Sequence, residues 1–237
     1  MCARFAQHSG PSRYLEQFGR GWMDATLPNA PARFNIAPTQ DALVVRVSPE
    51  TGLGTFSLLR WGLVPSWAKD LKFGARTINA RSETVAETPA FRGAWKAGRR
   101  CVVPADAFYE WAPGSSPKQP YAIARADGAA LALAGLWDGW KDPATGAWLR
   151  TFTILTCGPN PFMAQMHDRM PVILPPGAAE PWLRGEIGAE ALVPYGADDL
   201  TLWPVTTRLN APRNEGEDLI APVSVTAAEP PAAPLLI

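Results

Sequence analysis

The residue at position 2 is a cysteine, directly after the initiator methionine. Methionine is normally removed when the next side chain is small, so we expect the mature chain to begin with Cys2, which then carries a free α-amine beside its thiol. The pKa of an α-amine is about 8 and that of a thiol about 8.5, so both are nucleophiles near neutral pH. An aldehyde would react first with the amine to give a Schiff base, and then with the sulfur to close a five-membered thiazolidine ring.

The same N-terminus is compatible with two other interpretations. If the thiol attacked an amide while the amine served as base, the protein would be an N-terminal nucleophile hydrolase. Amidotransferases of that kind continue into an apolar strand, whereas this chain places the cation Arg4 two residues after Cys2, which favours an anionic ligand. In the third interpretation Cys2 is an ordinary second residue with no chemical role.

Two further stretches carry groups suited to aldehyde chemistry. Asn79 and Arg81 in "RTINARSET" are two residues apart, so in an extended segment they share one face and could hold a sugar oxygen and a phosphate. Glu110 lies between Tyr109 and Trp111 at the end of an apolar stretch. A carboxyl group among aromatic rings tends to have a raised pKa, which suits it to proton transfer; the alternative is a surface glutamate on an edge strand.

A histidine and a tryptophan complete the candidate residues. His167 is one of only two histidines, and imidazole is the usual acid or base near pH 7, although a lone histidine is also often structural. "RWGLVPSWAKD" places Trp61 and Trp67 among prolines and cations. We expect Trp61 to pack in the core and Trp67 to be exposed, where an aromatic ring among cations can stack on unpaired bases.

Composition narrows the class of protein. The chain has 237 residues, 47% of them hydrophobic, which is enough to bury a core without disulfides. Its three cysteines, Cys2, Cys101 and Cys157, have no CxxC spacing, so neither a disulfide framework nor a zinc site is indicated. The sequence shows no secretory signal and no apolar run of about 18 residues, so we expect a cytoplasmic protein that does not enter a membrane.

The charges balance overall but not locally. The chain has 22 basic and 22 acidic residues, yet positions 60–100 contain nine Lys or Arg and three Asp or Glu, while positions 177–237 contain nine acidic and three basic residues. A mixed, solvated surface would explain any one of these charges. The local excess is equally consistent with a basic face for an anionic partner.

The hydrophobic patterns predict the elements that must position these residues. Strands are expected at 42–47, 55–64, 100–111, 120–126, 130–137, 148–156, 170–174 and 201–206, and helices at 12–19, 88–98, 160–167 and 178–187, with Ser12 and Asn160 as caps. Strands and helices do not alternate regularly. The predicted class is therefore α+β, a single domain with a mainly antiparallel, curled or barrel-like β-sheet and flanking helices.

Taken together, seven stretches resemble the SRAP family (SOS-response-associated peptidase), whose members process abasic sites in single-stranded DNA. They are "MCARF", "FNIAPTQ", "RWGLVPSWAK", "INARSET", "RCVVPADAFYEW", "HDRMPVIL" and "VTTRLNAPRNEGEDLIAPV", in the family's order and across about nine tenths of the chain. The resemblance predicts an abasic-site processing domain at 1–226. The proline-rich segment 227–237 is predicted to be a flexible tail.

The resemblance also implies roles for individual residues. The catalytic residues would be Cys2, Asn79, Glu110 and His167. Cys2 would form a thiazolidine with the ring-opened aldehyde, and His167 would donate the proton that helps to open the deoxyribose ring. Glu110 would orient or deprotonate the N-terminal amine and transfer protons at the imine, and Asn79 would be an orienting hydrogen-bond partner. Contacts to DNA are implied for Arg4, Pro38, Trp67 and Arg81. The family usually has glycine at the position of Ala3, and a second tryptophan is absent after Trp67.

The function implied is that of a DNA-damage protein that binds single-stranded DNA and crosslinks covalently to abasic sites, thereby shielding them. Its partner would be single-stranded DNA with abasic sites, including sites at junctions with duplex, bound by a monomeric cytoplasmic protein associated with the nucleoid. No metal or organic cofactor is expected. The alternatives are a thiol peptidase that uses Cys2 as nucleophile, and a non-covalent binder of modified or junction DNA.

Overall fold

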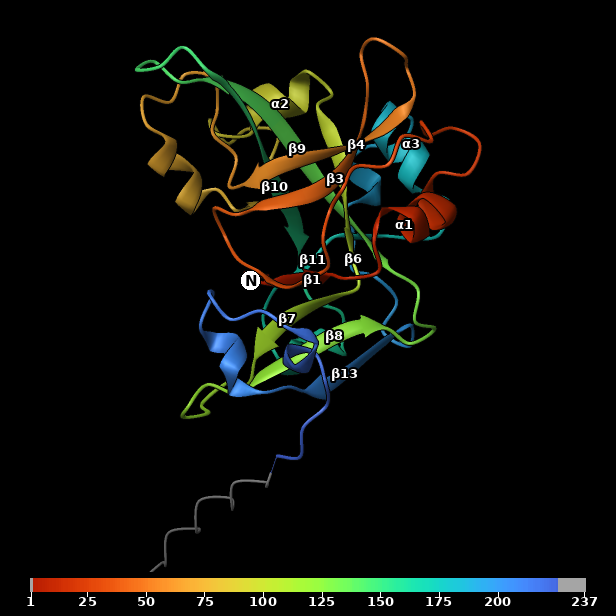
Figure 1. The fold of residues 1–237 in the computed structure, drawn as a ribbon, viewed down its shortest axis with the longest axis vertical. Helices are drawn as coiled ribbons and strands as arrows, with labels where there is room; N and C mark the ends of the chain where they lie inside the picture. Colours follow the sequence, from red (N-terminus) through yellow and green to blue (C-terminus); the bar gives the residue numbers. More distant parts are fainter. Residues whose placement is uncertain (1, 226–237) are drawn as a thin grey trace, which may run out of the picture.

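The computed structural model describes residues 2–225 (Figure 1). The expected removal of Met1 and the predicted tail at 227–237 concern residues outside this range. Within it, no helix has the length and apolar character needed to cross a membrane.

Two β-sheets make up most of the fold. The smaller sheet has the order β13 (Leu200–Pro204), β8 (Pro120–Arg125), β7 (Ala107–Trp111), β1 (Phe5–Gln7) and β2 (Arg33–Ile36). The larger has the order β11 (Met170–Pro171), β10 (Trp148–Cys157), β4 (Gly54–Trp61), β3 (Asp41–Val47), β6 (Arg100–Ala105), β9 (Leu131–Lys141) and β12 (Ile173–Leu174), with β5 (Asn79–Arg81) also paired to β10. The helices are α1 (Pro11–Phe18), α2 (Arg92–Lys96) and α3 (Ala179–Arg184), and the 3-10 helices are η1 (Leu71–Arg76), η2 (Met163–Gln165), η3 (Ala189–Ala191), η4 (Thr207–Asn210) and η5 (Glu217–Leu219).

The larger sheet closes on itself. Strands β9 and β10 pair from Gly135↔Ile154 to Lys141↔Trp148, which joins the two ends of the order β10-β4-β3-β6-β9 into a five-stranded barrel. Most pairs are antiparallel, but β10 runs parallel to both β4 and β5. The predicted class is therefore confirmed: the protein is a strand-rich α+β domain with a mainly antiparallel, barrel-like sheet and short helices.

Strand β1 belongs to the smaller sheet and lies on its side nearest the barrel (Figure 1). Its Phe5 is buried and meets the ring of Trp61 edge-on, with centroids 5.0 Å apart, and Trp61 in turn stacks on Phe152 at 6.3 Å. Burial of each such ring contributes about 2 to 3 kcal/mol. This packing confirms that Trp61 belongs to the core, and it fixes the start of the chain against the barrel.

The stretch 100–111, predicted as one strand, is two strands in different sheets. The break is at Asp106, whose Oδ2 accepts hydrogen bonds from the backbone N–H groups of His8 at 2.6 Å and Ser9 at 2.9 Å and from the hydroxyl of Tyr14 at 2.6 Å. These partners lie far away in the sequence, so the strand pattern did not reveal the turn. As a result, β7 leaves the barrel and runs beside β1.

Three of the four predicted helices form, shorter than predicted or with a different start, and the fourth, at 160–167, does not. Helix α1 starts at Pro11 after Gly10, because proline has no N–H to satisfy and is favoured at the first helical position; Ser12 is not the cap. Of the segment 160–167 only one 3-10 turn forms, although Asn160 Oδ1 does accept a hydrogen bond from Met163 N at 2.7 Å.

Two other segments are also shorter than predicted. The segment 88–98 contributes only α2, and 178–187 contributes α3, which ends at Gly185 with φ 78°. The segment 170–174 is divided between β11, which pairs with β10, and β12, which pairs with β9.

Candidate active site at the N-terminus

Pairing between β1 and β7 brings Cys2 toward Glu110. Phe5 lies opposite Phe108, and the pairing continues toward the N-terminus because Tyr109 N donates to Arg4 O at 3.0 Å. Cys2 is fully buried there. Because antiparallel neighbours run in opposite directions, the residues before Phe5 lie beside the residues that follow Phe108.

Asn79 holds Cys2 from the barrel side. The Asn79 Nδ2 donates to the carbonyl oxygen of Cys2 at 2.8 Å, and the pairing of Asn79 with Ile154 in β10 fixes the strand that carries it. The Asn79 Oδ1 is buried and accepts no hydrogen bond from the residues that the structure describes. The amide therefore orients Cys2 with one atom and leaves a buried acceptor beside it.

Glu110 has the buried environment that its aromatic neighbours suggested. Its side chain lies in β7 and is only 3% exposed, and burial raises the pKa of its carboxyl above the usual 4.5. The negative charge of Asp168 acts in the same direction. A surface glutamate on an edge strand is thus the wrong interpretation of this residue.

The thiol of Cys2 has a strongly raised pKa. Burial is the main cause, and the negative charge of Glu110 adds to it, while a contact of Sγ with the carbonyl oxygen of Arg4 at 3.8 Å acts weakly in the opposite direction. The thiol is therefore protonated at neutral pH.

His167 lies between η2 and β11. Its Nδ1 accepts a hydrogen bond from Arg169 N at 3.1 Å, which leaves Nε2 as the atom that can exchange a proton with a ligand. Partial burial lowers the pKa of His167, and the contact of Nδ1 with Asp168 Oδ1 at 2.6 Å opposes that shift without cancelling it.

An ion pair that the sequence did not predict joins the segment of His167 to the segment that follows β5. Arg169 donates to both carboxylate oxygens of Glu83, at 2.6 and 2.9 Å, and to the carbonyl oxygen of Thr156 at 2.6 Å. Because Arg169 N also holds His167, this pair ties the orientation of the imidazole to the segment that follows Asn79. Both residues lie inside the quoted motifs, but neither their residue types nor their positions in the sequence predict that they form an ion pair.

We expect Glu83→Gln to lower the free energy of unfolding at pH 7 by about 1 kcal/mol, since Glu83 is half exposed and solvent screens the pair. Arg169 lowers the pKa of Glu83 from 4.5 to about 2, so the contribution is present above pH 4.5 and is lost as pH falls toward 2. Urea denaturation of both proteins between pH 7 and pH 3 measures the difference. A difference that does not shrink in acid would contradict this account.

Arg4 is engaged by the protein itself. Its Nη1 donates to Asn35 Oδ1 at 3.0 Å and to the carbonyl oxygen of Leu209 at 2.9 Å, and its guanidinium lies 5.9 Å from the ring of Trp111. Arg81, in contrast, is exposed and has no side-chain partner among residues 2–225. Of the two predicted phosphate contacts, Arg81 is therefore free to make one, and Arg4 can use only its remaining donors.

Trp67 and Pro38 both lie near the C-terminal end of β4, which Trp61 occupies. Trp67 is 57% exposed, as predicted, and meets Phe73 edge-on at 5.2 Å. Pro38 is partly buried in the turn 37–40, in which Thr39 has φ 73° and donates to Trp61 O at 2.9 Å. Among the described residues that carry a β-carbon, only Thr39 has positive φ, so Ala3 introduces no strain.

The basic segment 60–100 is only partly available to a ligand. Arg99 is bonded to Asp138, and Arg100 packs on the Trp182 ring at 4.4 Å. Lys69, Lys72 and Arg76 are exposed, and with Trp67, Phe73 and the anion Asp70 they form what we call the 67–76 surface. Other exposed cations of the segment, namely Arg81, Arg92 and Lys96, lie outside this surface. The local charge excess therefore includes both structural cations and an exposed aromatic and cationic surface.

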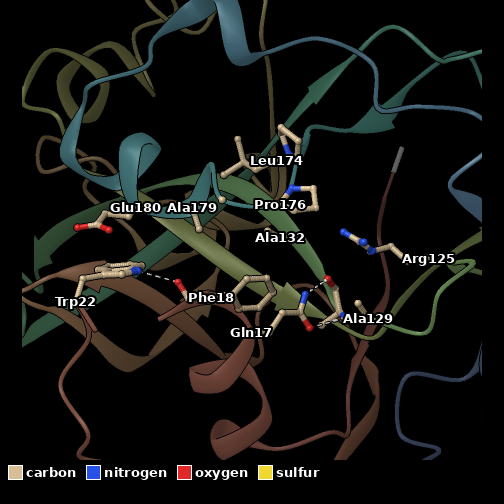
Figure 2. Close-up of a pocket in the computed structure, with 13 residues that line it drawn as sticks. Gln17, Phe18, Trp22, Arg125, Ala129, Ala132, Leu174, Pro176, Ala179 and Glu180 are labelled. Atoms are coloured by element: carbon tan, nitrogen blue, oxygen red, sulfur yellow. Dashed lines mark hydrogen bonds between the residues drawn. The ribbon is translucent and has the colours of Figure 1, made fainter. Parts of the chain in front are cut away.

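A hollow of about 260 Å³ lies away from these residues, between α1 and α3 (Figure 2). Figure 2 shows its mainly apolar lining, which includes Phe18, Trp22, Leu174, Pro176 and Ala179. None of the catalytic or DNA-contacting residues predicted from the sequence lines this hollow. Within residues 2–225, no three His, Cys, Asp or Glu side chains come together as a metal site would require.

Comparison with known proteins places the chain in a family. The profile of the family "SOS response associated peptidase (SRAP)" matches residues 1–212. The chain is 39% identical over 229 residues to the abasic site processing protein YoaM of Bacillus subtilis, covering 93% of this chain and 97% of that protein, and 31% identical over 234 residues to YedK of Escherichia coli, covering 94% and 100%. A crystal structure of a Bordetella bronchiseptica protein superposes with a TM-score of 0.74 at 32% identity, covering 86% and 100%. The chain therefore belongs to the SRAP family.

Proposed function

We propose that this protein captures abasic sites in single-stranded DNA by forming a thiazolidine between Cys2 and the sugar aldehyde. Two of its relatives carry the name abasic site processing protein, which supplies the class of substrate. The observation that carries the proposal is the arrangement at the N-terminus, where the Cys2 carbonyl is held by Asn79 beside the buried carboxyl of Glu110.

The reaction consists of two bond-forming steps. The α-amine of Cys2 adds to C1′ of the ring-opened sugar, and loss of one water gives an imine. The thiol sulfur then adds to the same carbon, and the thiol proton moves to the nitrogen. The product is a five-membered ring that contains both nucleophiles and has lost one water relative to the reactants.

The thiol pKa determines the order of these steps. Since burial keeps the Cys2 thiol protonated, the amine is the stronger nucleophile for the first attack, and sulfur follows once the imine carbon is held beside it. The same property disfavours the thiol peptidase, because a peptidase needs its thiol pKa lowered rather than raised.

In this proposal Glu110 and Asn79 act on the α-amine of Cys2, the first by proton transfer and the second by positioning. A buried carboxyl with a raised pKa can take the proton from the α-ammonium group and later return it to the hydroxyl that leaves as water. The Asn79 Oδ1, which accepts nothing from the described residues, is suited to hold the amine or a sugar hydroxyl in line with the attack.

His167 acts on the sugar ring. An abasic sugar is mostly a closed hemiacetal, and opening it to the aldehyde requires a proton at the ring oxygen. Because Arg169 N and Asp168 Oδ1 both contact Nδ1, Nε2 is the ring atom left for the ligand and is the donor in this proposal.

We expect His167→Ala to slow adduct formation on an abasic oligonucleotide about a hundredfold. On a substrate whose aldehyde is already open, such as an acyclic analogue, the variant should react at the rate of the unmodified protein, because the step that His167 assists is absent. Single-turnover kinetics with both substrates test this. Equal slowing on the two substrates would contradict the assignment.

The strand would cross the protein near Arg81, with bases against the 67–76 surface. Arg81 is exposed and unpaired among the described residues, and Trp67 presents an indole among cations. In this proposal Arg4 positions the N-terminus more than it binds phosphate, and Pro38 shapes the turn beside Trp61.

The experiment that tests the function compares intact and abasic oligonucleotides incubated with the protein, after its N-terminal mass has been determined. We expect a heat-stable adduct only with the abasic strand. Turnover of a peptide without DNA would support the peptidase instead, and salt-sensitive binding without any covalent product would support the non-covalent binder.

A further inference from the structure

A second cationic surface lies where strands β4 and β10 separate. The two strands pair only at Arg60↔Thr151 and Trp61↔Phe152, so the earlier residues of both strands diverge. A trough of about 860 Å³ occupies the gap. Its lining includes Leu58, Arg60, Arg99, Trp137, Trp148 and Arg150.

The trough presents an exposed indole. Trp148 is 72% exposed, and its ring lies over Gly139, 3.6 Å from the point that a β-carbon there would occupy. The flat face of this indole forms part of the trough lining and is accessible to solvent. Trp137 lies deeper, with the guanidinium of Arg46 at 5.2 Å and that of Arg99 at 5.9 Å from its ring centre.

Positive charge exceeds negative charge along this lining. Arg150 is exposed and makes no side-chain hydrogen bond or ion pair within residues 2–225, although Glu50 lies near enough for the charge of Arg150 to lower its pKa slightly. Arg60 makes one hydrogen bond, to Thr39 O at 2.5 Å. Arg99 is neutralised by Asp138, and Asp41 is the acidic residue that lines the trough. Exposed guanidinium groups beside an exposed indole suit a chain of phosphates and unpaired bases.

The trough is continuous with the 67–76 surface. Ser66 lines the trough and directly precedes Trp67. The hairpin that carries Trp148 packs on the same segment, because Trp140 Nε1 donates to Ala68 O at 2.7 Å. In Figure 1 this hairpin, which joins β9 to β10, projects from the barrel.

We propose that the trough between β4 and β10 binds a second stretch of the same single-stranded DNA, with a base stacked on Trp148 and phosphates on Arg60 and Arg150. The inference rests on the proposed function, because the strand that meets Cys2 is the one that continues past the 67–76 surface. An acidic peptide would also match the charges. We favour DNA over a peptide because the trough is continuous with the 67–76 surface, along which the proposed DNA path runs.

Two abasic oligonucleotides test the trough, each with the lesion at its centre, one about 6 and one about 20 nucleotides long. The variant is Trp148→Ala with Arg150→Ala; both side chains are exposed and neither belongs to the reaction. We expect the variant to need about a tenfold higher protein concentration for half-maximal capture of the long strand, and the same concentration as the unmodified protein for the short one.

A second arm separates this inference from the covalent chemistry. Equilibrium binding of undamaged 20-nucleotide DNA needs no adduct, and we expect the variant to lose about tenfold in affinity and about 0.7 from the salt-dependence slope, the value for one phosphate contact on a single strand. Trp148→Phe with Arg150→Lys should retain most of the affinity. Arg20→Ala, an exposed cation after α1, should retain all of it.

Unchanged affinity for the long undamaged strand would overturn the proposal, as would an equal loss on short and long abasic strands. Loss of binding to a Glu-rich peptide, with DNA binding unaffected, would make the trough a peptide site and also overturn it. Failure of the unmodified protein to form any adduct would count against the proposed function alone.

Discussion

Replacing Cys2 with Ala is expected to abolish the heat-stable adduct with abasic single-stranded DNA. The variant keeps an α-amine after removal of Met1, so an imine can still form, but without sulfur the imine hydrolyses and no ring closes. Gel electrophoresis after heating measures the loss. With a borohydride present during the reaction, the same variant should give a trapped adduct, because reduction of the imine does not need the thiol.

Two variants provide the controls. Cys157→Ala removes another buried thiol and should leave adduct formation unchanged. An N-terminal extension by one glycine keeps the thiol but removes the cysteine α-amine, and it should abolish the ring as completely as Cys2→Ala does. A heat-stable adduct from Cys2→Ala without reductant would show that the thiazolidine is not the product.

Changing Glu110 to Gln is expected to slow adduct formation about a hundredfold or more, because the amide cannot take the proton from the α-ammonium group. Rates measured from pH 5 to pH 9 should show a carboxyl-dependent limb in the unmodified protein that disappears in the variant. Its midpoint should lie above the usual carboxyl value of 4.5, since burial raises the pKa of Glu110.

The same change should not destabilise the fold at neutral pH. A carboxyl whose pKa is raised in the folded state binds its proton more tightly there than in the unfolded chain, so the protein loses stability as pH rises from 4.5 through the raised pKa. The amide removes that loss. Denaturation of both proteins at pH 8 should therefore find Glu110→Gln at least as stable; a less stable and equally slow variant would mean that Glu110 acts through structure.

Much of the site could be predicted because its residues carry their chemistry locally. Cys2 is identified by its position, Glu110 by its aromatic neighbours, and Trp67 by the cations around it. The strands that carry these residues also follow from short apolar runs.

The remaining features depend on partners that are distant in the sequence. Asp106 divides a predicted strand only because His8, Ser9 and Tyr14 donate to it. Arg4 has the character of a free cation in the sequence, yet the structure uses its Nη1 for Asn35 and Leu209.

Long-range pairing also explains two further features that the sequence did not reveal. The Glu83–Arg169 pair joins residues 86 positions apart. The trough at Trp148 exists because β4 and β10 pair over two positions only. Such a short parallel pairing produces no hydrophobic pattern in the sequence of either strand, so the trough could not be predicted.

The most direct test of the central claim is mass analysis of the N-terminal peptide after reaction with an abasic oligonucleotide, followed by treatment with a thiol alkylating agent. We expect a peptide that begins at Cys2, is joined to the sugar with loss of one water, and does not take up the alkylating agent, because its sulfur is in the ring. An imine has the same mass but a free thiol. An adduct on a lysine, or an N-terminal adduct that is alkylated at sulfur, would contradict the proposed thiazolidine.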